Sequence, residues 1–299
     1  MQSITLNSFM VMRTDNNFFG MINGAVGNVT LYVRNGKQVI AQRARQIGNP
    51  RTDVQMMQRI KLANVLATYR LLRDLLRTCF EPVDDACRTS LATVYNRFTS
   101  VNLLALPVFL TRWQAREGGC VAAPYRVSDG SLTAINVTDG ASGALTDIRL
   151  GGLELTDQTT VACFTKAVIG LNPLYEQGDS IAYMHLSQTP AGDTGIPRVT
   201  PLFCSLRLDA ADRRPLRSLV PALGFSSQGG CLGQGAAADA CAFAWIHTRP
   251  GSKGVLASTQ QLVAHNCLFD EFGSPRAARE ALDSYHARAV PVAPGVGAR

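Results

Sequence analysis

The sequence has few of the residues and motifs on which enzyme chemistry depends. Its 299 residues include only four histidines, which leaves few candidates for a general base. It has no G-x-S-x-G nucleophile motif, no C-x-x-C pair, no Walker-type phosphate loop and no strand–GxGxxG–helix unit. These absences argue against a serine hydrolase, a zinc site of paired cysteines and a nucleotide-binding enzyme. We therefore expect a protein that is not an enzyme and that uses no cofactor and no metal.

Long apolar runs and a secretory leader are also absent. No stretch of eighteen consecutive apolar residues occurs, which excludes a transmembrane helix, and we expect no membrane partner. The first residues, MQSITLNSFMVMRTDNN, do not place a basic region before an apolar one, as a secretory signal does. The sequence therefore predicts synthesis in the cytoplasm without a secretory signal, and it leaves open a final location in a particle or virion.

Eight cysteines are present, but their spacing does not predict a metal site. Without an indicated oxidising compartment, free and mostly buried thiols are favoured, and structural disulfides stay the alternative. Cys231 and Cys241 lie ten residues apart across a Gly/Ala-rich loop, which disfavours zinc binding with His247. Cys120 follows two glycines and is expected to be exposed near Arg116, so it is the most nucleophile-like thiol, although no partner histidine is identifiable.

Positive charge is concentrated in one part of the chain. Ten cations and only two carboxylates, Asp53 and Asp74, lie between residues 34 and 77. This window has a net charge of +8, whereas the whole chain has +7, so the rest of the chain is close to neutral. The cations are Arg34, Lys37, Arg43, Arg45, Arg51, Arg59, Lys61, Arg70, Arg73 and Arg77. An electrostatic partner is therefore expected to meet this segment.

The same segment contains a hairpin followed by a helix. Residues 26–33 alternate in polarity and lead into Asn35-Gly36, the dipeptide that favours a type I′ turn, and then into a second β-forming run. Thr52 and Gln55 have the spacing of a capping box, and apolar residues recur at helical spacing from there to about Phe80. A second helix is predicted over residues 86–105, after the acidic pair at 84–85.

From about residue 125 the sequence predicts short strands separated by turn residues. The predicted strands include TTVACFTKAVI, SIAYMHLSQ, PLFCSLRL and CAFAWIHTR, whereas SSQGGCLGQGAAADA is read as a loosely packed loop. Ser274-Pro275 then begins a short helix, and the tail after it is expected to be flexible. The fold class is thus α+β, with an N-terminal β-hairpin and two helices packed with a mostly antiparallel β-sandwich-like region. The expected segments are 1–120, 121–272 and 273–299.

These motifs resemble a family of uncharacterised proteins, mostly from Bacteroidetes, that open with a Gly-rich basic hairpin and end in a β region. The resemblance spans most of the chain and is strongest over residues 20–102; the Gly/Ala-rich insertion and the C-terminal helix depart from it. It implies the same fold and carries over no catalytic residue. The matching residues are Gly24, Gly27, Asn28, Tyr32, Arg34, Gly36 and Lys37, then Asn49, Pro50, Arg51, Thr52, Gln55 and Arg59, and the segment YNRFTSVN at 95–102.

Two functions remain for a basic hairpin without a catalytic set. The favoured one is a structural protein that self-associates or joins a larger particle, for instance of bacteriophage or mobile-element origin, with the hairpin as its docking arm. The alternative is a nucleic-acid-binding protein that uses the same cations, although Tyr32 is the single aromatic residue of the ribbon. The expected partner-binding residues are Tyr32, Arg34, Lys37, Arg43, Arg45, Arg51 and Arg59.

Overall fold

The chain forms two compact units in the computed structural model, which describes residues 11–14, 23–34, 37–43, 51–82, 94–140, 143–235, 239–252 and 254–287. The first unit comprises Met1–Arg51 with Val83–Leu91, and the second comprises Thr52–Pro82 with Ala92–Arg299. Helices and mostly antiparallel sheets occur together, so the predicted α+β class is confirmed. The contacts divide the chain near residue 51, inside the segment 1–120 expected from the sequence.

The first unit contains a four-stranded antiparallel sheet in the order β1-β4-β3-β2. Its strands are β1 (Val11–Thr14), β2 (Gly24–Val26), β3 (Val29–Arg34) and β4 (Lys37–Gln42). Arg34 pairs with Lys37, which confirms the predicted hairpin, although Asn35 and Gly36 themselves lie outside the described residues. Residues 26–33 are not one strand, because Gly27 adopts a positive φ of 58° and turns the chain between β2 and β3.

The helices of the second unit begin at the sites that capping chemistry favours. The predicted helix is confirmed as α1 (Asp53–Leu76), where the Thr52 side chain accepts a hydrogen bond from the Gln55 backbone N–H. The C-terminal helix is confirmed as α6 (Pro275–His286), capped by Ser274. Helix α2 (Val94–Asn102) covers the second half of the predicted helix 86–105, whose first half lies outside the described residues. The short helices α3 (Arg112–Arg116) and α5 (Phe269–Phe272) complete this group.

Two larger sheets and a short strand pair build the β part of the second unit. The five-stranded sheet, called the larger sheet below, has the order β13-β12-β8-β9, with β15 beside β12. The four-stranded sheet, called the smaller sheet, has the order β10-β11-β7-β6. The larger sheet contains β8 (Ser180–Thr189), β9 (Arg198–Arg207), β12 (Cys241–Gly251), β13 (Gly254–Ala257) and β15 (Val263–His265). The smaller contains β6 (Val137–Gly140), β7 (Gly143–Arg149), β10 (Ser226–Gln228) and β11 (Cys231–Gly233). The short pair is β5 (Arg126–Ser128) with β14 (Gln260–Gln261).

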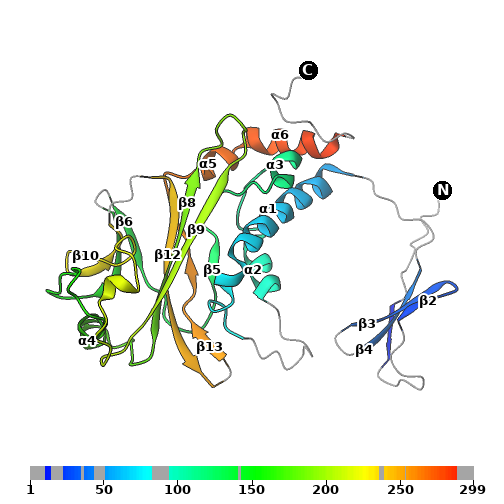
Figure 1. The fold of residues 1–299 in the computed structure, drawn as a ribbon. Helices are drawn as coiled ribbons and strands as arrows, with labels where there is room; N and C mark the ends of the chain where they lie inside the picture. The colour runs from blue at the N-terminus through cyan, green and yellow to red at the C-terminus, as the bar shows by residue number, and fades with distance from the viewer. Residues whose placement is uncertain are drawn as a thin grey trace. The chain divides into compact units, whose positions relative to one another are not determined.

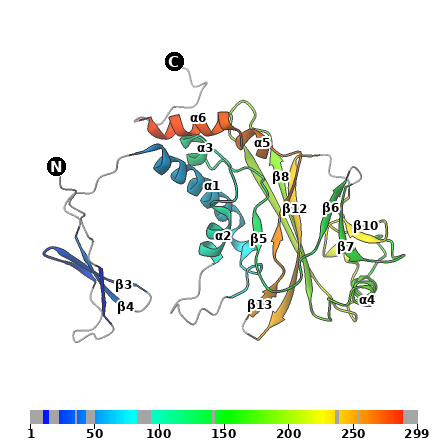
Figure 2. The same cartoon turned by 180° about the vertical axis from the view of Figure 1, so that it is seen from behind.

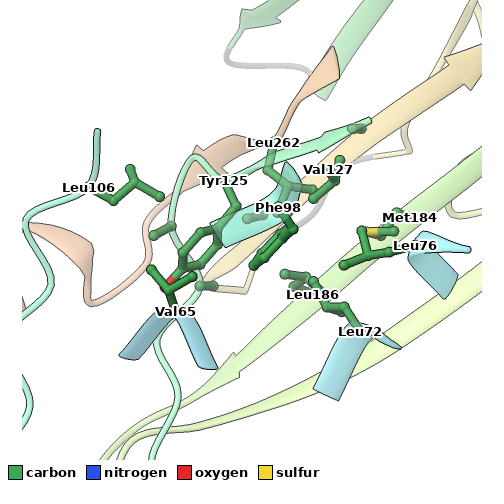
Figure 3. Close-up of a cluster of buried hydrophobic side chains, with 14 of the residues drawn as sticks. Val65, Leu72, Leu76, Phe98, Leu106, Tyr125, Val127, Met184, Leu186 and Leu262 are labelled. Atoms are coloured by element: carbon green, nitrogen blue, oxygen red, sulfur yellow. The ribbon is translucent and has the colours of Figure 1, made fainter. Parts of the chain in front are cut away.

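The larger sheet is covered on both faces. Helices α1, α2, α3 and α6 lie on one side of it, and the smaller sheet lies on the other (Figure 1 and, from behind, Figure 2). Met184 and Leu186 of β8 pack on the helical side with Leu72 of α1 and Phe98 of α2, as Figure 3 shows. Tyr183, which directly precedes Met184, packs in the other cluster, toward the smaller sheet. Strand β8 is therefore buried on both faces, so its apolar run is almost continuous.

The prediction of a strand at TTVACFTKAVI is wrong, because most of this segment is helix α4 (Val161–Leu171). Its buried residues Val161, Phe164, Thr165 and Val168 follow helical spacing, and Phe164 packs edge-on against Phe225. The Thr160 side chain accepts a hydrogen bond from the Cys163 backbone N–H and caps the first turn. A short run of apolar residues suits a strand and a buried helix alike, and here the cap and the spacing favour the helix.

The expectation of a loosely packed loop at SSQGGCLGQGAAADA is also wrong. Strands β10 and β11 form a hairpin in which Gln228 pairs with Cys231, and β11 in turn pairs with β7. Gly229 and Gly230 both have positive φ, which is the requirement of a two-residue hairpin turn. The Gly-Gly pair was therefore a turn signal; residues 236–238 lie outside the described part.

Candidate functional site

Three of the expected docking residues share one face of the N-terminal sheet. Tyr32 and Arg34 are two residues apart on β3, so their side chains lie on the same face of the sheet. Arg34 is directly opposite Lys37 of β4, which places the Lys37 side chain on that face too. Arg34 and Lys37 are exposed, and Tyr32 is 37% exposed. This face therefore presents an aromatic ring beside two cations.

The remaining expected residues are distributed over both units. Arg43 follows β4 and is exposed, with its backbone N–H donating to the Asn28 carbonyl. Arg45 lies outside the described residues. Arg51 is exposed with a positive φ of 51°, whereas Arg59 is an exposed residue of α1 in the second unit. The structure thus groups Tyr32, Arg34 and Lys37 on one face, whereas Arg59 belongs to the second unit.

The described side chains of strands β2, β3 and β4 bury little apolar surface. Among the side chains described between residues 23 and 43, only those of Gln38 and Val39 are buried. Val26, on the edge strand β2, is a large hydrophobic residue left exposed. A small sheet needs a covered hydrophobic face to be stable by itself, so this sheet has an apolar surface that another surface can cover.

A second cationic surface lies on α1. Arg70, Arg73 and Arg77 are exposed and follow one another at spacings of three and four residues, which places them on one side of the helix. Arg73 and Arg77 both approach the Asp74 carboxylate, at 3.6 and 3.9 Å, but all three side chains are more than half exposed. Ion pairs this exposed contribute little, so the arginines can bind another anion.

A group of charged and polar side chains, most of them buried, surrounds Asp179. Asp179, just before β8, accepts hydrogen bonds from Arg249 Nε at 2.7 Å and from His247 Nε2 at 2.8 Å. The Glu176 backbone N–H donates to the same carboxylate at 2.9 Å, and Tyr175 stacks on the imidazole with ring centroids 4.3 Å apart. The Asp179 and His247 side chains are 2% and 3% exposed. We call Tyr175, Asp179, His247 and Arg249 the Asp179 cluster.

The surroundings of the Asp179 cluster fix its protonation. Burial acts to raise the pKa of Asp179, but hydrogen bonds from Arg249, the Glu176 backbone and His247 outweigh it and leave the pKa below its ordinary value. Burial lowers the pKa of His247, and together with the positive charge of Arg249 it outweighs the opposite effect of the Asp179 carboxylate. A neutral His247 beside an ionised Asp179 must donate from Nε2, which leaves Nδ1 as an acceptor.

The sequence contained only part of the signal for this cluster. His247 and Arg249 alternate with apolar residues in the strand CAFAWIHTR, so they were visible as polar residues on one face of a buried strand. Asp179 lies in a turn before another strand, and only the pairing of β8 with β12 brings it to them. Sequence reasoning missed the cluster because long-range pairing cannot be read from one strand.

The expectation that Cys120 is exposed and nucleophile-like is wrong. Its side chain is buried, lies 3.5 Å from the Thr68 hydroxyl, and has a pKa raised to about 11 by burial. Burial likewise raises the pKa of Cys79 to about 12. Such thiols stay protonated at neutral pH and are poor nucleophiles. The thiols of Cys79, Cys120, Cys163, Cys204, Cys231 and Cys267 are free.

Within the described ranges, no three His, Cys, Asp or Glu side chains converge in a way that could hold a metal ion. No helix in these ranges has the length and apolar character needed to span a bilayer. Comparisons with protein-family models, curated proteins and solved structures find no match to this chain.

Proposed function

We propose that this protein is a non-enzymatic structural protein that self-associates or joins a larger particle, with the N-terminal sheet as its docking element. The observation that carries this proposal is the small apolar burial of a sheet that forms a unit of its own. Covering Val26 and the Tyr32 face with another subunit supplies the buried area that the sheet lacks.

Charge indicates the kind of surface that the docking element meets. Arg34 and Lys37 stand opposite each other on β3 and β4, so two copies of this face would repel each other. An acidic or carbonyl-rich surface of a neighbouring subunit has the complementary charge. We therefore infer that the sheet of one subunit docks on a different surface of the next, which is the heterologous contact from which rings and filaments form.

The first test is the mass of the protein in solution. We expect light scattering at high concentration to give a mass above that of a monomer, and a double change of Tyr32→Ala and Arg34→Glu to shift the population toward monomer by at least tenfold in dissociation constant. Loss of a partly buried aromatic anchor and reversal of an interfacial charge have effects of this size.

Arg213→Glu is the matched charge reversal for this test, because Arg213 is an exposed residue of the second unit far along the chain. It should leave the association unchanged. A strictly monomeric wild-type protein at high concentration, or equal effects of the two charge reversals, would contradict the proposed docking element.

Nucleic-acid binding is the second candidate, favoured by the arginine row on α1. Arg70 and Arg77 are seven residues apart, which corresponds to about 10 Å along a helix and matches the reach of a few successive phosphates. We expect the triple change of Arg70, Arg73 and Arg77 to Gln to reduce the slope of log affinity against log salt by about 2.7 on duplex DNA, as measured by filter binding.

The control for the arginine row changes three other exposed arginines of the second unit, Arg198, Arg207 and Arg213, to Gln. Both triple variants lose the same net charge, so only a local phosphate contact makes them differ. Absence of any retention of wild-type protein on DNA at low salt eliminates this second function.

A further inference from the structure

A pocket of about 270 Å³ opens beside the Asp179 cluster. Its wall is formed by the end of β7, the chain segment that follows α4, and His247 of β12. The residues that matter below are Asp147, Arg149, Leu171, Leu174 and His247. The volume is that of a cavity for a small organic molecule.

His247 is held rigidly and yet has unused binding capacity. Its Nε2 is hydrogen-bonded to Asp179, and its ring stacks on Tyr175 at an interplanar angle of 28°. His247 lines the pocket, and no described residue donates a hydrogen bond to its Nδ1. A ligand in the pocket can therefore donate a hydrogen bond to this acceptor.

The rest of the wall adds a cation and an apolar rim. Arg149 is exposed and forms no ion pair with another described residue, whereas the Asp147 carboxylate already accepts from Asn136 Nδ2 at 2.7 Å. Leu171 and Leu174 at the rim are 46% and 55% exposed, which is high for leucine. The pocket thus offers a guanidinium for an anion, an imidazole acceptor for a donor, and leucine side chains for an apolar group.

We propose that this pocket binds a small organic carboxylate with a hydrogen-bond donor on the adjacent carbon, such as an α-hydroxy acid. The carboxylate pairs with Arg149, the neighbouring hydroxyl or N–H donates to Nδ1 of His247, and the apolar substituent contacts Leu171 and Leu174. The same arrangement of a carboxylate beside a donor occurs at the C-terminus of a polypeptide. This site is independent of the N-terminal sheet, so it stands whether or not the protein assembles.

The test uses full-length protein and three probes that differ by one group. Mandelate carries the carboxylate, the hydroxyl and an apolar ring; phenylacetate lacks the hydroxyl, and 1-phenylethanol lacks the carboxylate. We expect mandelate to bind about tenfold more tightly than either of the others, because each lacks one of the two polar contacts. Binding is followed through the ¹⁵N resonances of the histidine side chains, where Nδ1 of His247 should shift and Nε2 should stay protonated.

Variants and a fourth probe complete the test. Arg149→Gln should weaken mandelate binding about tenfold, whereas Arg213→Gln, the same change on an exposed arginine outside the pocket, should not. N-acetylphenylalanine represents a polypeptide C-terminus. If it binds more tightly than mandelate, the ligand of the pocket is a polypeptide C-terminus and not a small hydroxy acid. Equal affinity for all probes, no shift of the His247 resonances, or an unprotonated Nε2 would overturn the proposal.

Discussion

Replacing Trp245 by Ala is expected to lower the free energy of unfolding of the second unit by about 4 kcal/mol. Trp245 is fully buried on β12 and packs against the Tyr183 and Phe243 rings, with centroids 5.1 and 5.8 Å away. Its indole N–H donates to the Gly224 carbonyl at 2.7 Å, so the change leaves a cavity and an unpaired carbonyl. Urea unfolding followed by circular dichroism measures the loss without relying on tryptophan fluorescence.

Two other substitutions separate the contributions to this loss. Trp245→Phe keeps most of the ring but removes the N–H donor, so it should fall between wild type and Trp245→Ala. Trp113→Ala removes the only other tryptophan, which is partly buried on α3, and should cost clearly less. If Trp113→Ala and Trp245→Ala destabilise the protein equally, the sandwich interior does not have the packing described.

Replacing Asp179 by Ala is expected to destabilise the second unit by about 3 kcal/mol at neutral pH. The change removes the acceptor of Arg249 Nε and of His247 Nε2, so the buried His247 N–H loses its partner and the guanidinium, which is 24% exposed, keeps only Glu176 and the Leu174 carbonyl. Arg276→Gln, which breaks the exposed pair with Glu280, is the control and should barely change the unfolding midpoint. A loss below 1 kcal/mol for Asp179→Ala would mean that water or a rearranged side chain replaces the carboxylate.

The same cluster gives the wild-type protein a defined acid sensitivity. Burial lowers the folded-state pKa of both His247 and His185 below the ordinary 6.5, so below pH 6.5 the unfolded state binds protons that the folded state does not. Stability therefore falls as the pH drops, by up to about 1.4 kcal/mol per pH unit for each histidine. His247→Gln should remove its share of this slope and leave the share of His185 in place.

A second acid transition is expected at lower pH. The pKa of Asp179 is lowered in the folded state, so its contribution is fully present above the ordinary value of 3.8 and is lost as the pH falls through the folded-state value. Glu81, whose carboxylate accepts from the Ser131 and Ala257 backbone N–H groups, adds to this transition. The Asp179→Ala variant should lack the contribution of Asp179 to this transition and keep that of Glu81.

Features set by local chemistry could be predicted from the sequence. The cap residues Thr52 and Ser274 marked the starts of α1 and α6, and Asn-Gly marked the turn between β3 and β4, because each acts within a few residues. The segment 161–171 was misread because its exposed side carries Cys163, Gly170 and Leu171 beside a single charged residue, Lys166, so its sequence lacks the polar face that distinguishes an amphipathic helix from a strand.

The candidate pocket could not be predicted in the same way. His247 and Arg249 are two residues apart, but Asp179 and Arg149 join them only through the register of β12 with β8 and through the packing of the two sheets. A single sequence gives the polarity of each position and not the partner across the interior. The basic residues were easier to find, since charge on an exposed surface needs no partner to be recognised.

The burial of β8 on both faces also sets an order for biosynthesis. Helix α1 is translated before the strands that cover its apolar side, β8 and β12. Until β8 and β12 have been made, Leu72 and its neighbours have no sheet to pack on, so the nascent chain exposes the apolar side of this helix. The helical layer can pack only once these two strands are present.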